Sequence, residues 1–128
     1  MSIVALLPII ALMAQAPPSA SSLDFEYFKA KVQPILLAKR EGHARCVSCH
    51  SSGTPMRLQP LSPGAATWTD EESRKNFDVI RARVKSGNPV ASKLLTHPLA
   101  ESAGGDSSHD GGKHWFSQDD PEWQTLAA

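Results

Sequence analysis

The sequence contains few of the residues that usually hold a small domain together. Only two of its 128 residues are cysteine, and its aromatic residues number three Trp, four Phe and one Tyr. Thirteen Lys and Arg balance thirteen Asp and Glu, so no excess charge favours binding to nucleic acid or to an anionic membrane surface. The length allows one domain with a modest core, and ten prolines and eight glycines predict long irregular connections.

The N-terminal apolar run, residues 3–13, is too short to span a membrane. It is followed by Ala14-Gln15-Ala16, and a short apolar region ending in Ala-x-Ala is typical of a secretory signal peptide. We therefore expect a signal peptide over residues 1–16, a linker over 17–22 and one domain over 23–128. Because Met1 and Ser2 provide no Lys or Arg, retention of the segment as a weak membrane anchor is the alternative.

Both cysteines lie in one pentapeptide, Cys46-Val47-Ser48-Cys49-His50. The pattern Cys-x-x-Cys-His indicates attachment of a c-type haem. Two thiols at this spacing can each add to one haem vinyl group, and the adjacent imidazole can then bind the iron. The sequence thus predicts thioethers at Cys46 and Cys49, with His50 as the proximal iron ligand. The haem would supply apolar bulk that the chain itself lacks.

Three other interpretations of the cysteine pair remain. A thioredoxin-like dithiol belongs beside a βαβ pattern, which we do not find in the sequence. A zinc site usually combines two short ligand motifs, and no second such motif is present. A disulfide would close too short a loop to add much stability. Further candidate zinc ligands are His43, His97, His109 and His114.

Hydrophobic spacing predicts a first helix that begins near Leu23, kinks or breaks at Pro34 and stops at Gly42. One face of it would be apolar and would pack in the core. The residues of that face are Phe25, Phe28, Val32, Ile35 and Leu36. The cations that follow, including Arg40, are expected on a solvated face, where one of them could pair with a haem propionate.

A second helix is predicted from the capping box that starts at Thr69 to a stop at Gly87, with Arg81, Arg83 and Lys85 in its last turn. Residues 51–69 and 96–117 have the composition of loops. A short helix should start at Asn88-Pro89 and run to about Thr96. A final helix should be capped by Ser117. Because this helix would reach residue 128, we expect it to be truncated or the domain to belong to a longer protein.

This order of features resembles the class I cytochrome c fold. More narrowly, it is similar to single-haem planctomycete-type cytochrome c domains, and the likeness covers roughly residues 23–128. The supporting stretches, apart from the haem motif, are Phe28-x₃-Val32-x-Pro34-Ile35-Leu36 and Asn88-Pro89-x₂-Ser92-x-Leu94-Leu95. The resemblance implies an all-α fold of about four helices wrapped around one covalently bound haem, with long Gly- and Pro-rich loops.

The chain departs from this family at the sixth iron ligand. In the family, a Met-Pro-Pro segment shortly before the last helix usually provides it, whereas this sequence has His109-Asp110-Gly111-Gly112-Lys113 there. By position, His109 takes the place of the methionine. His97, His114, Met56 and an open coordination site are the alternatives.

A bis-histidine haem has a lower potential than a Met/His haem. We therefore expect a low-spin, low-potential electron carrier with bis-histidine ligation, periplasmic or otherwise exported, that exchanges single electrons with redox partner proteins and transforms no substrate. No Ser/His/Asp or paired-carboxylate pattern argues for catalysis. A gas-binding or sensor haem domain and an accessory redox module of a larger complex are the two alternatives.

Overall fold

The computed structural model describes residues 22–128, and the regular structure of this part of the chain is helical. This confirms the expected all-α class. Its elements are α1 (Phe25–Tyr27), η1 (Phe28–Val32), α2 (Gln33–Leu37), α3 (Cys46–His50), α4 (Asp70–Arg81), η2 (Pro89–Ala91), α5 (Lys93–Thr96), η3 (Glu101–Ala103) and α6 (Pro121–Ala127). The predicted signal peptide and all of the predicted linker except Ser22 lie outside the described residues.

Between residues 22 and 128, no helix is long and apolar enough to cross a membrane.

The first helix is a continuous run of α1, η1 and α2. Its N-terminus is capped by Asp24, whose Oδ1 accepts a hydrogen bond from Tyr27 N at 2.9 Å. The middle part, η1, is a π-helical turn just before Pro34, the residue predicted to disturb the helix because it lacks a backbone N–H. The helix ends at Leu37, so the predicted stop at Gly42 is wrong. Gly42 instead has a positive φ of 73° within the turn bridged by Arg40 and His43.

Helix α4 begins as predicted. The Thr69 hydroxyl accepts from Glu72 N at 3.3 Å, and the Glu72 carboxylate accepts from Thr69 N at 2.8 Å, which completes the capping box. The helix ends at Arg81, well before the predicted stop at Gly87. Beyond Arg81 the chain forms a turn instead of a further helical turn. There the buried Ser92 hydroxyl accepts a hydrogen bond from Lys85 N at 2.9 Å.

The C-terminal half differs from the expectation at two caps. Ser92 divides the predicted short helix into η2 and α5, and Asn88 makes no side-chain capping bond. The last helix, α6, is capped by Asp120, whose Oδ1 accepts from Glu122 N at 2.9 Å. The prediction that Ser117 caps it is wrong.

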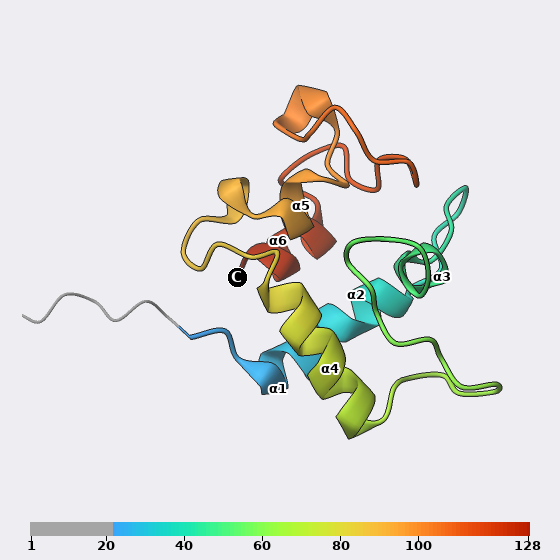
Figure 1. Cartoon of the computed structure of the whole chain (residues 1–128). Helices are drawn as coiled ribbons and strands as arrows, with labels where there is room; N and C mark the ends of the chain where they lie inside the picture. The colour runs from blue at the N-terminus through green and yellow to red at the C-terminus, as the bar shows by residue number, and fades with distance from the viewer. Residues whose placement is uncertain (1–21) are drawn as a thin grey trace, which may run out of the picture.

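The core consists of two clusters of buried side chains. The first lies where α4 crosses the first helix (Figure 1), and it is centred on contacts among the rings of Phe25, Phe28 and Phe77. The second joins α2, α5 and α6 through Ile35, Leu95, Leu99, Trp115 and Trp123. Leu126 packs against both clusters.

We expect Leu99→Ala to lower the free energy of unfolding by about 2–5 kcal/mol, because Leu99 is fully buried (0% exposed) and its removal leaves a cavity in the second cluster. The measurement is urea unfolding. The matched control is Val90→Ala at a 59% exposed side chain, for which we expect a change within about 0.5 kcal/mol. Equal losses in the two variants would contradict this description of the core.

Candidate functional site

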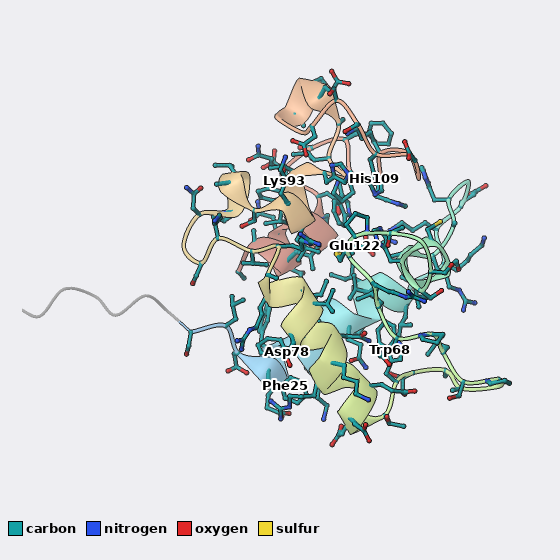
Figure 2. All side chains as sticks on the ribbon, viewed as in Figure 1. Phe25, Trp68, Asp78, Lys93, His109 and Glu122 are labelled. Atoms are coloured by element: carbon teal, nitrogen blue, oxygen red, sulfur yellow. The ribbon has the colours of Figure 1, made fainter. Side chains whose placement is uncertain are left out.

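A cavity of about 730 Å³ brings together residues from both halves of the chain. This volume falls within the roughly 300–1,000 Å³ of typical cofactor and ligand sites. The predicted site residues line it: Cys46, Cys49, His50, His97 and His109, together with the alternatives His114 and Met56. Figure 2 labels His109 on the loop that follows α5 and Glu122 on α6.

Helix α3 consists of the pentapeptide that contains both cysteines. Residues three apart share one face of a helix, so Cys46 and Cys49 both reach the cavity. Both are free thiols; Cys46 is half-buried and Cys49 is exposed. Burial raises the pKa of the Cys46 thiol, and the nearby Arg40 guanidinium partly opposes that rise.

The His50 ring is held by its Nδ1 atom. Nδ1 lies 3.0 Å from the Met56 carbonyl oxygen and 3.1 Å from Thr54 Oγ1. Because a carbonyl oxygen only accepts, Nδ1 donates to it and carries the proton. The neutral ring then keeps a lone pair on Nε2, the arrangement in which histidine binds a metal. The Met56 backbone lies beside the His50 ring. The structure therefore does not support the Met56 thioether as the iron ligand opposite His50.

The His109 ring lies across from the His50 ring. The two ring centres are 6.2 Å apart and the ring planes differ by 18°. His109 Nδ1 lies 2.5 Å from the Gly112 carbonyl oxygen, so this ring too is protonated at Nδ1 with a lone pair on Nε2. Gly112 has a φ of 80°, and its N–H donates back to the His109 carbonyl at 2.8 Å. Burial lowers the pKa of His109, which favours the neutral form.

The other two candidate histidines contact His109. The His97 ring centre is 5.0 Å from that of His109, and His97 Nδ1 lies 3.0 Å from Asp106 Oδ2. The His114 ring centre is 5.6 Å from that of His109 and 5.0 Å from that of His43. His114 Nδ1 is buried with no hydrogen-bond partner among residues 22–128. Among His97, His109 and His114, it is His109 that contacts the His50 ring and whose Nδ1 atom is hydrogen-bonded to a backbone carbonyl.

The 6.2 Å separation of the His50 and His109 ring centres is close to that of two imidazoles bound to one metal ion. A metal–imidazole bond is about 2 Å long, so two imidazoles bound on opposite sides have ring centres roughly 6 Å apart. Within residues 22–128, no group of three or more His, Cys, Asp or Glu side chains is placed to hold a bare metal ion. A porphyrin provides four nitrogen ligands itself and needs only one or two from the protein.

A polar network beside Cys46 was missed by the sequence analysis. Arg40 is only 14% exposed at its side chain and forms a 2.5 Å ion pair with Glu122, so its expected place on a solvated face is wrong. Its Nη2 also donates to the Ile35 carbonyl at 3.2 Å, and its Nη1 is 3.9 Å from Cys46 Sγ. Trp115 Nε1 donates to Glu122 at 3.2 Å. No local pattern links positions 40, 115 and 122.

Comparison of the chain with protein-family models, with curated proteins and with solved structures gives no match.

We expect the protein to lose stability as the pH falls from about 6.5 to about 4. The pKa of His114 is lowered from 6.5 to about 4, mainly because burial disfavours the imidazolium, with Arg40 and His109 adding repulsion. In this window the unfolded chain binds a proton that the folded chain does not, so protonation favours unfolding. Urea midpoints at about pH 7.5 and about pH 5 measure the loss. His114→Asn should flatten this dependence; an equally steep dependence in the variant would contradict the assignment.

Proposed function

We propose that the protein is a c-type electron carrier with one haem attached through Cys46 and Cys49 and bound axially by His50 and His109. The observation that carries the proposal is the facing pair of imidazoles, 6.2 Å apart, beside two free thiols on one helix face. Nδ1 of each ring lies against a backbone carbonyl oxygen, and in a neutral imidazole this leaves Nε2 free to bind a metal.

The two cysteines and the two histidines have different tasks in this proposal. Each thiol would add across one vinyl group, so that an S–C bond forms and the thiol hydrogen passes to the neighbouring carbon; no oxidant is consumed. His50 and His109, as neutral nitrogen donors, would hold the haem iron. A haem so bound supplies an iron that changes between the ferrous and ferric states.

The chain's own residues would also limit movement around the metal. Thr54 Oγ1 donates to the Met56 carbonyl at 2.9 Å, and Leu58 N donates to the His50 carbonyl at 2.7 Å. Arg83 donates to the Pro55 carbonyl at 2.7 Å. These bonds hold the segment that orients His50. A rigid site favours electron transfer because little rearrangement accompanies the change of charge.

The wider proposal is that of an exported domain with a cytochrome c-like arrangement of helices. The predicted signal peptide and the requirement for haem attachment outside the cytoplasm support a periplasmic or other extracytoplasmic location. Its partners would be redox proteins, either in free exchange or within a larger complex. We propose no enzymatic activity, because the proposed haem attachment and iron ligation account for the thiols and the imidazoles of His50 and His109 in the cavity.

Purification tests the attachment. The mature chain, produced in a host with cytochrome c maturation machinery, should be coloured and should carry the mass of one haem after denaturation. Cys46→Ser/Cys49→Ser should lose that covalent mass, since both sulfur nucleophiles are gone. Ser48→Ala, at an exposed position in the same helix, is the matched control and should retain it. Colourless protein with the mass of the bare chain would overturn the proposal.

Redox titration tests the distal ligand. We expect His109→Met to raise the midpoint potential by on the order of 0.1 V or more, because thioether ligation favours ferrous iron and axial ligands span roughly 0.8 V. His43→Met, at a histidine that does not line the cavity, is the matched control and should leave the potential close to that of the wild type. An unchanged potential and spectrum in His109→Met would remove His109 from the site. Binding of carbon monoxide by the reduced wild type would instead favour a gas-binding domain.

A further inference from the structure

His109 lies on a long irregular segment, residues 104–114, which we call the distal strap. Both ends of the strap are bonded to the chain around α5. At the first end, Asp106 N donates to the Thr96 carbonyl at 2.9 Å; at the second, His114 N donates to the Pro98 carbonyl at 2.8 Å. His109 lies between these ends, and its ring is braced by the local turn to Gly112.

The first end fits tightly against its neighbours. A Cβ atom at Gly105 would lie 1.8 Å from the Leu99 carbonyl oxygen, so no other residue can occupy this position without displacing the backbone. The Asp106 carboxylate accepts from Lys93 Nζ at 2.8 Å and pairs with His97 Nδ1 at 3.0 Å. The hydrogen bond from Lys93, and then that from His97, lower the pKa of Asp106. Lys93 and His109 are both labelled in Figure 2.

One side chain connects the two ends of the strap. Lys113 Nζ donates to the Asp106 carbonyl in a short bond and to the His97 carbonyl at 3.0 Å. A charged ammonium makes stronger hydrogen bonds to carbonyls than a neutral donor does. Lys113 thereby joins the second end of the strap to its first end and to the residue that follows α5. It does not line the cavity, so its role there is indirect.

We propose that Lys113 is a positioning residue that closes the distal strap and thereby holds His109 opposite His50. This inference rests on the proposed haem function. Without the ammonium, the carbonyl groups of His97 and Asp106 lose their donor. The first end of the strap keeps its backbone bonds and the Asp106 side-chain bonds, whereas the second end keeps only backbone bonds. His109 would then be held less firmly opposite His50, and a haem bound between them would be more open to a small ligand.

The test compares Lys113→Met with the wild type, both as haem-loaded full-length protein. Methionine keeps much of the length of the side chain but donates no hydrogen bond. We expect the apparent affinity of the reduced protein for carbon monoxide to rise at least roughly tenfold, which corresponds to about 1.4 kcal/mol. The oxidised protein should gain a high-spin signal in its magnetic resonance spectrum, while covalent haem content stays unchanged.

Two further variants make the test specific. Lys113→Arg keeps a charged donor and should restore low-spin haem and wild-type carbon monoxide binding. Lys75→Met removes a lysine that pairs with Glu71 on the exposed surface of α4, and it should leave both readouts unchanged. Should Lys113→Met fail to accumulate, Lys113→Leu, which also donates no hydrogen bond, is judged by the same two readouts. Unaltered readouts in the neutral variant, or equal opening in Lys113→Arg and Lys75→Met, would overturn the proposal.

His109→Ala separates this inference from the proposed function. If His109→Ala opens the haem and the neutral Lys113 variant does not, the role of Lys113 is wrong and the ligand assignment stands. If His109→Ala leaves a low-spin haem that ignores carbon monoxide, the ligand assignment itself fails.

Discussion

Two backbone carbonyl groups, those of Met56 and Gly112, determine the chemistry available at the cavity. Each accepts a hydrogen bond from the Nδ1 atom of one imidazole, His50 or His109. A neutral imidazole has one protonated and one unprotonated nitrogen, so both bonds leave a lone pair at Nε2. The loop after α3 holds the Met56 carbonyl in place, and the turn within residues 104–114 holds the Gly112 carbonyl.

The two core clusters place these loops on either side of the cavity. The first cluster contains Val47 of α3 and is packed against by Met56, so it supports the His50 side. The second contains Leu99 and Trp115, which flank the segment that carries His109 and form an isolated β-bridge with each other. The ion pair between Arg40 and Glu122 connects the approach to α3 with α6. Movement within either cluster would therefore change the separation of the two imidazoles.

For the first helix and for α4, local patterns predicted the start better than the end. The capping box at Thr69 needs only residues within one turn, and it is present in the structure as expected. The ends of the first helix and of α4 depend on distant contacts. Helix α4 gives way to a turn held by Ser92, and the first helix stops five residues before Gly42 because the chain must turn toward α3. The start of α6 was also missed, because Asp120 rather than Ser117 caps it.

The sequence by itself determined the residue types of the site: two thiols and a histidine in one pentapeptide, and further histidines in a glycine-rich segment near the C-terminus. It could not rank those histidines by contact, because spacing along an irregular loop says nothing about which ring meets His50. Only the tertiary structure decided that His109 faces His50, that the Met56 backbone lies on the His50 side, and that Arg40 pairs with Glu122. The physical reason is that the His50–His109 and Arg40–Glu122 contacts join residues far apart in the chain, so their geometry depends on how the two clusters pack. The Met56 contact is local, but it depends on the conformation of an irregular loop.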